Sequence, residues 1–205
     1  LGAVRAAVGE AQMLCEHAYD LPDPPPVEVV VEGAGPGAAG AGPVAACAPM
    51  HATYALVELL KNALVATVER HRYEHGDDAL EDGVDDLAPV VVRLAETDAG
   101  VRVAIVDEGG GIDAPTLAAC LGLRPSLSQR YDRLDEPGGS YNSGSQKPIS
   151  GVGIGLPMSR LFAAHLGGTL TLASNHGPPF GEGVGPRFST TATFELPAPT
   201  ALSTC

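Results

Sequence analysis

Two polar side chains that could act in a cleft lie four residues apart in an otherwise apolar segment. Glu58 and Asn62 interrupt a run of leucine, alanine and valine residues. On a helix, positions four apart project from one face, so a carboxylate and an amide would converge there. Asn has a poor helix propensity and a buried Glu is costly. The pair therefore favours a helix face that borders a cleft, although an amphipathic helix with a solvated polar stripe has the same spacing.

A second candidate site follows an apolar, strand-like segment. Asp107 and Glu108 precede three consecutive glycines, Gly109, Gly110 and Gly111. The Asp107 carboxylate can accept a hydrogen bond from an exocyclic amine, and the glycines permit a close approach of the backbone to a planar ligand. Taken alone, the motif is equally consistent with an acidic turn at the end of a strand.

A third, glycine-rich motif precedes an apolar helical segment. It consists of Gly151, Val152, Gly153, Ile154, Gly155 and Leu156. The free N–H groups and the dipole at the start of a helix favour a chain of phosphates. Alone, the motif could also be a flexible hinge. A Rossmann loop is a weaker alternative, because the preceding strand and the acidic ribose ligand downstream are missing.

Charge and composition limit the partners of these motifs. The formal net charge is -13 with 12 Lys and Arg residues, so we expect no nucleic-acid partner. A bound nucleotide would depend on local N–H groups and a divalent cation. Four scattered cysteines form neither a zinc nor a disulfide pattern. No apolar stretch approaches the ~20 residues that span a bilayer, so we expect no membrane span.

The elements that must position the motifs are predicted from apolar periodicity and turn residues. We expect helices over residues 1–19, 49–71 and 156–166, and strands over residues 27–32, 89–96, 101–106, 169–174 and 190–196. Residues 109–150, which contain one short helical piece near 114–122, have the composition of a lid. Residues 74–86 are rich in carboxylates, and a solvated surface loop is favoured there over a cation site.

These segments divide the chain into three parts. Residues 1–25 form a lead-in helix and linker, residues 26–197 the main domain, and residues 198–205 a tail. The chain begins at Leu1 inside a helical segment, so we expect that the natural N-terminus lies upstream.

In this order, the three motifs resemble the N box and the two glycine boxes of the GHKL superfamily, which includes histidine kinases, gyrase and mitochondrial dehydrogenase kinases. Two sequences narrow the resemblance: H-A-T-Y-A-L-V-E-L-L-K-N-A-L-V-A-T-V-E-R-H, from His51, and G-L-P-M-S-R-L-F-A-A-H-L-G-G-T-L, from Gly155. Both are similar to the pyruvate and branched-chain 2-oxoacid dehydrogenase kinases. The resemblance implies a two-layer α/β sandwich of the GHKL (Bergerat) type, a mixed sheet with helices on one face and a mobile ATP lid.

The resemblance also implies a role for each matching residue. Glu58 matches the general base toward a substrate serine, and Asn62 matches the Mg ligand. Asp107 matches the carboxylate that binds the adenine amino group. The other matching nucleotide contacts are Gly109 and Gly111 beside the ring, Gly153, Gly155 and Leu156 at the phosphates, Ser126 in the lid, and Thr190 near the adenine. Val65 occupies a position at which the family has a basic residue, so one phosphate contact is expected to be absent.

The implied activity is Mg-ATP-dependent phosphorylation of a serine of a 2-oxoacid dehydrogenase (E1) component in the mitochondrial matrix. In the family, a preceding helical bundle docks onto the complex through the lipoyl domain of its E2 component, and this chain lacks that bundle. Two alternatives stay open: the catalytic domain of a sensor histidine kinase, and a non-catalytic module that binds ATP or ADP. The sequence also leaves open the choice between pyruvate and branched-chain substrates, and whether the chain forms a homodimer.

Overall fold

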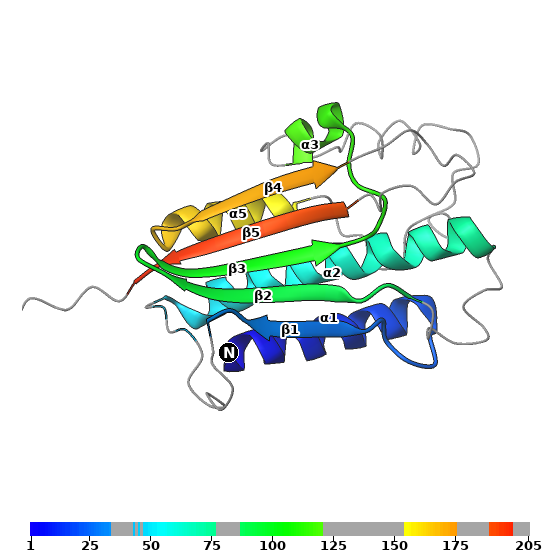
Figure 1. The fold of residues 1–205 in the computed structure, drawn as a ribbon, viewed down its shortest axis with the longest axis horizontal. Coiled ribbons are helices and arrows are strands. Elements are labelled where there is room, and N and C mark those ends of the chain that lie inside the picture. The colour runs from blue at the N-terminus through cyan, green and yellow to red at the C-terminus, as the bar shows by residue number, and fades with distance from the viewer. Residues whose placement is uncertain are drawn as a thin grey trace, which may run out of the picture.

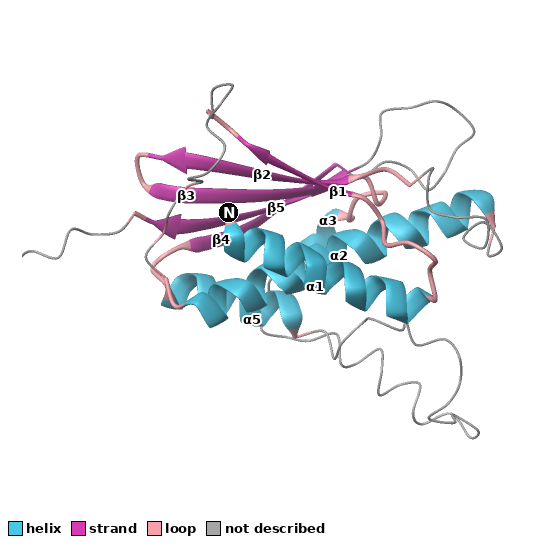
Figure 2. Ribbon diagram, turned by 90° about the horizontal axis from the view of Figure 1, so that it is seen from below, coloured by secondary structure: helices cyan, strands magenta, loops and turns pink. Residues whose placement is uncertain are grey.

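The computed structural model describes residues 1–33, 43, 45, 47–76, 87–120, 154–175 and 189–198. Within these residues, the long helices lie together on one face of a five-stranded sheet, and Figure 2 shows no described helix on the other face. The helices are α1 (Gly2–Tyr19), α2 (Pro49–His75), α3 (Ala114–Cys120) and α5 (Gly155–His165). The predicted two-layer α/β sandwich is therefore confirmed.

The sheet is mixed, as expected. Its strands are β1 (Val27–Val31), β2 (Val90–Thr97), β3 (Gly100–Asp107), β4 (Thr169–Asn175) and β5 (Ser189–Pro197), in the spatial order β1-β2-β3-β5-β4 (Figure 1). β1 pairs with β2 in parallel, and the other three pairings are antiparallel. β3 therefore lies in the centre of the sheet, and its last residue, Asp107, is aligned with Thr190 of β5.

Helix α2 is the centre of the core. It lies between α1 and α5 and packs on β3. Its buried side chains include Leu60, Leu64 and Val68, which are fully enclosed. Each contributes roughly 1.5 to 3 kcal/mol through burial. This packing fixes the polar positions of α2 relative to the sheet. None of the described helices is long and apolar enough to cross a membrane.

The predicted end of α2 is wrong by four residues. The helix continues from His71 to His75, so Glu74 belongs to the helix and not to the acidic loop. An ion pair of 2.6 Å between Arg70 and Glu74 supports this extra turn, because side chains four apart are neighbours on a helix. Gly76 then ends the helix with φ of 94°. The rest of the acidic segment, residues 77–86, and most of the expected lid, residues 121–150, lie outside the described residues.

Candidate functional site

One face of α2 carries the candidate site. Glu58, Asn62 and Ala66 follow each other at intervals of four residues and share this face. Gly155 lies so close to Glu58 that a Cβ atom on the glycine would overlap the carboxylate. Gly109 likewise lies close to Ala66, and a Cβ atom there would overlap the side chain and the backbone of this residue. The exposed Asn62 therefore lies between the places where the two glycine motifs contact α2.

Glu58 is held by an ion pair that the sequence motif did not reveal. Its Oε1 atom lies 2.6 Å from Nζ of Lys61, and the two side chains are only 18% and 13% exposed. The opposite charge offsets the cost of removing the carboxylate from water. The other oxygen, Oε2, is the atom that faces Gly155 at the start of α5. Lys61 is a functional candidate that a spacing argument misses, because a lysine on a helix is usually solvated.

Asp107 provides a buried negative charge at the end of β3. Its side chain is enclosed, and its Oδ1 atom accepts a hydrogen bond of 2.9 Å from the N–H of Gly109. Burial raises the pKa of the Asp107 carboxyl to about 6, and hydrogen bonds from the N–H groups of Gly109 and Thr190 oppose this rise. The group is therefore mostly ionised at neutral pH although it is buried. Such a carboxylate is a strong acceptor for an amine in a dry site.

The glycines after Asp107 meet two different steric demands. Gly109 has no room for a side chain because of Ala66, whereas Gly110 and Gly111 have φ angles of 96° and 75°. Positive φ angles are strained for residues with a Cβ atom. At the far end of the loop, the N–H of Ile112 donates a hydrogen bond of 2.6 Å to Oγ of Ser174 in β4. The loop therefore contacts α2 at Gly109 and is bonded to the sheet at Ile112.

The sequence prediction did not include Ser174. Its alternation with Leu170 and Leu172 places it on the face of β4 that carries the core. A polar residue on the apolar face of a strand was the available signal. Thr190, which the resemblance did identify, is buried and lies in register with both Asp107 and Ser174.

The first turn of α5 leaves few N–H groups free. The first hydrogen bond within the helix runs from the N–H of Met158 to the carbonyl of Ile154, at 2.9 Å. The N–H groups of Gly155 and Leu156 have no acceptor within the helix, and Pro157 has no N–H. These two N–H groups are available to an anion. Ser126, Gly151, Val152 and Gly153 lie outside the described residues, so their assignments stay predictions.

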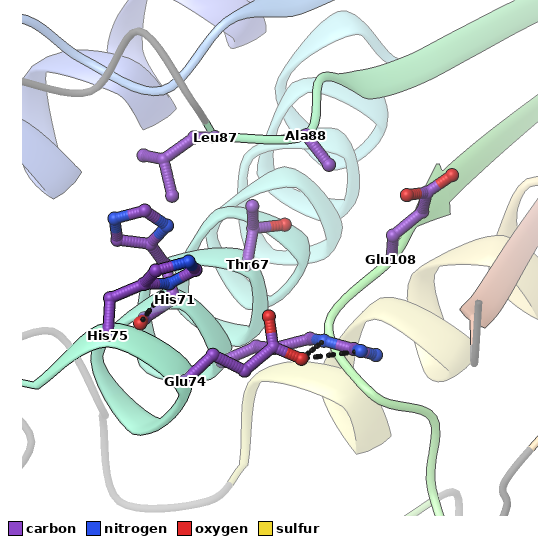
Figure 3. Close-up of a pocket in the computed structure, with 8 residues that line it drawn as sticks. Thr67, His71, Glu74, His75, Leu87, Ala88 and Glu108 are labelled. Carbon is purple, nitrogen blue, oxygen red and sulfur yellow. Dashed lines mark hydrogen bonds and ion pairs between the residues drawn. The ribbon is translucent and has the colours of Figure 1, made fainter. Parts of the chain in front are cut away.

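Two other features of α2 lie apart from these contacts. Val65 is half-buried and offers no charge or hydrogen bond for a phosphate. A pocket of about 220 Å³ lies beside the C-terminal half of α2 (Figure 3). Its lining contains none of the predicted site residues and consists of Thr67, Arg70, His71, Glu74, His75, Leu87, Ala88 and Glu108. Glu108 therefore lines this pocket, whereas the adjacent Asp107 does not.

Among the described residues, no three His, Cys, Asp or Glu side chains form a group that could hold a metal ion.

Comparison with known proteins identifies one matching family and several similar kinases. Residues 48–200 match the family described as histidine kinase-, DNA gyrase B-, and HSP90-like ATPase. The chain is 29% identical to the mitochondrial pyruvate dehydrogenase (acetyl-transferring) kinase of Schizosaccharomyces pombe, over 85% of its own length. The corresponding kinases of Ascaris suum and Drosophila melanogaster are 31% and 30% identical to it, each over 85% of the chain. The chain spans 37% of the first of these relatives and 38% of the other two.

Proposed function

Because the chain belongs to the family of histidine kinase-, DNA gyrase B- and HSP90-like ATPases, we propose that the cleft beside α2 binds Mg-ATP. The observation that carries this proposal is the contact of both glycine motifs with a single face of α2. The exposed Asn62 amide lies between these contacts, and the buried Asp107 carboxylate lies at the end of the neighbouring strand. This arrangement offers separate groups that could bind the adenine base, a metal ion and the phosphates of a nucleotide.

Each group has a distinct task in binding. Asp107 accepts a hydrogen bond from the adenine amino group, and the backbone of the Gly109–Gly111 loop flanks the ring. The N–H groups of Gly155 and Leu156 donate to the phosphates, as the start of a helix favours. Asn62 supplies an amide oxygen as a ligand of Mg, which suits a hard cation. Bound Mg neutralises the charge of the phosphates, which the net charge of -13 on the chain would otherwise repel.

We further propose that the full-length protein transfers the γ-phosphoryl group of ATP to a serine of a mitochondrial 2-oxoacid dehydrogenase. The similarity to three mitochondrial pyruvate dehydrogenase kinases supports pyruvate dehydrogenase as the substrate and a mitochondrial location, within which we propose the matrix. In this reaction, Glu58 accepts the proton of the serine hydroxyl, while the N–H groups at Gly155 orient the phosphates. Catalysis then rests mainly on positioning and on charge stabilisation.

Binding of nucleotide by this chain is the first test. We expect micromolar affinity for Mg-ATP or Mg-ADP by calorimetry, together with a rise in the melting temperature. A ligand at a hundred times its dissociation constant adds about 2.7 kcal/mol of stability. The control is Mg with inorganic phosphate, which lacks the adenine that Asp107 would bind. The absence of both binding heat and a thermal shift at millimolar Mg-ATP would contradict the proposal.

A second test concerns the phosphoryl acceptor. The full-length protein with Mg-ATP is expected to phosphorylate a serine of purified pyruvate dehydrogenase E1 faster than the branched-chain enzyme. A histidine-containing acceptor domain serves as the comparison. Phosphorylation of histidine alone would support a sensor histidine kinase. ATP binding without transfer to any acceptor would support a module whose output is a change of conformation.

A further inference from the structure

A hydroxyl group beneath the glycine loop has no role in the function proposed so far. We propose that Ser174 is a positioning residue, which holds the far end of the Gly109–Ile112 loop and thereby sets the preference for adenine over guanine. This inference rests on the proposed nucleotide site. It adds a residue that acts through the loop backbone and does not need to contact the nucleotide.

Ser174 belongs to a polar row that crosses three strands. Asp107 of β3 is aligned with Thr190 of β5, which is in turn aligned with Ser174 of β4. Hydrophobic residues occupy the neighbouring inward positions of the same strands, and Ile105 and Leu172 are both aligned with Ala192. The row therefore replaces the apolar core at one end of the sheet, directly below the loop that starts at Asp107.

The contacts of Ser174 use its whole hydrogen-bonding capacity. Its Oγ atom lies 2.6 Å from the nitrogen of Ile112, 3.3 Å from the carbonyl oxygen of Ser189 and 3.4 Å from Oγ1 of Thr190. An N–H can only donate and a carbonyl oxygen can only accept. The hydroxyl therefore accepts from Ile112 and donates to Ser189, which leaves its second lone pair for the hydroxyl of Thr190. A group with all its partners in place has little freedom to move.

The loop is consequently fixed to the sheet at both of its ends. The N–H of Gly109 bonds to Asp107, and the N–H of Ile112 bonds to Ser174. Between these points, Gly110 and Gly111 have positive φ angles and no side chains that could pack against a support. Loss of the Ser174 hydroxyl removes the hydrogen bond that joins the Ile112 end of the loop to β4. The loop backbone can then move relative to the carboxylate that binds the base.

Three variants of the full chain test this inference. Ser174→Ala removes the hydroxyl, Ser174→Thr retains it on a side chain that strands favour, and Thr97→Val is the matched control. The Thr97 hydroxyl donates a hydrogen bond of 3.2 Å to the carbonyl oxygen of Gly100 in the β2–β3 hairpin. This hairpin lies at the opposite end of β3 from Asp107. Calorimetry with Mg-ATP and with Mg-GTP gives the selectivity of each variant. Hydrogen exchange at the Ile112 amide reports on the loop itself.

We expect Ser174→Ala to bind Mg-ATP about tenfold more weakly, the scale of one net hydrogen bond, and Mg-GTP nearly as the parent does. The ATP-to-GTP preference then falls about tenfold and exchange at Ile112 accelerates, whereas Ser174→Thr and Thr97→Val keep the parent's preference.

Equal losses for both nucleotides, or an unchanged preference, would overturn the inference, because a purely structural role affects both alike. A parent chain that binds ATP without preferring it over GTP would also overturn it. A parent chain that binds no nucleotide would instead overturn the proposed function. If Ser174→Ala does not fold, Ser174→Cys, with its weaker hydrogen-bonding group, is subject to the same criteria.

Discussion

Replacement of Asp107 by Asn is expected to weaken Mg-ATP binding by roughly 10- to 100-fold, and at the same time to stabilise the empty protein at neutral pH. A hydrogen bond to a charged acceptor contributes about 1.5 to 3 kcal/mol, which sets the expected loss of affinity. The amide keeps the size of the side chain and an oxygen that can accept the Gly109 N–H. The variant therefore changes the charge with little change of shape.

The opposite effect on stability follows from the pKa of Asp107. Burial raises the pKa of this carboxyl from 3.8 to about 6 in the folded protein. Between these two pH values the folded chain binds more protons than the unfolded chain, so the contribution of Asp107 to stability falls as the pH rises. Above pH ~6 the ionised group costs roughly 3 kcal/mol. Thermal unfolding at pH 5 and pH 7.5 should show about half of this loss in the parent, because pH 5 already lies above the unfolded pKa, and Asp107→Asn should lack it.

Asn62→Ala is the informative counterpart, because it concerns the metal and not the base. Asn62 is exposed, so its removal should leave the unfolding free energy nearly unchanged. Nucleotide binding by this variant should lose its dependence on Mg while it keeps its preference for adenine. If both variants bound Mg-ATP like the parent, the assignment of the site would be wrong even though the fold is right.

The sequence predicted most of the fold because its signals were local. β-branched strands, the apolar periodicity of residues 49–71 and the glycines that end elements each indicate structure over a few residues. The parallel pairing of β1 with β2 and the strand order β3-β5-β4 were not predicted, because register depends on contacts between distant segments. The end of α2 was predicted wrongly because a run of carboxylates after His71 is typical of a solvated loop. In the structure, Glu74 instead forms an ion pair with Arg70 within the helix.

The parts of the site that the sequence missed depend on the same long-range geometry. Ser174 gains its partner only when β4 lies beside β5 and the glycine loop crosses above it. The close contact of Gly155 with Glu58 likewise joins segments almost a hundred residues apart. Motif matching found the glycines, but it could not indicate which residue of α2 each one contacts. The lid residue Ser126 and the glycines before Ile154 stay predictions, since they lie outside the described part of the chain.

Glu58→Gln in the full-length protein is expected to lower phosphoryl transfer by roughly 100-fold or more and to leave nucleotide affinity within about twofold. Loss of a general base commonly costs a factor of this size, whereas the amide keeps the size and polarity of the side chain. The assay measures single-turnover transfer to the E1 serine and Mg-ATP affinity on one preparation. A melting curve of the same preparation corrects for any loss of folded protein.

The ion pair with Lys61 calls for a matched control, because Glu58→Gln also removes the partner of a lysine that is only 13% exposed. Lys61→Gln breaks the same ion pair and keeps the carboxylate. If Glu58 served only to hold this pair, both variants would lose stability and activity alike. If it is the base, the two variants lose similar stability, but turnover falls far more in Glu58→Gln. Full turnover by a folded, ATP-binding Glu58→Gln variant would remove the catalytic assignment, and transfer would then rest on Mg and the N–H groups of α5 alone.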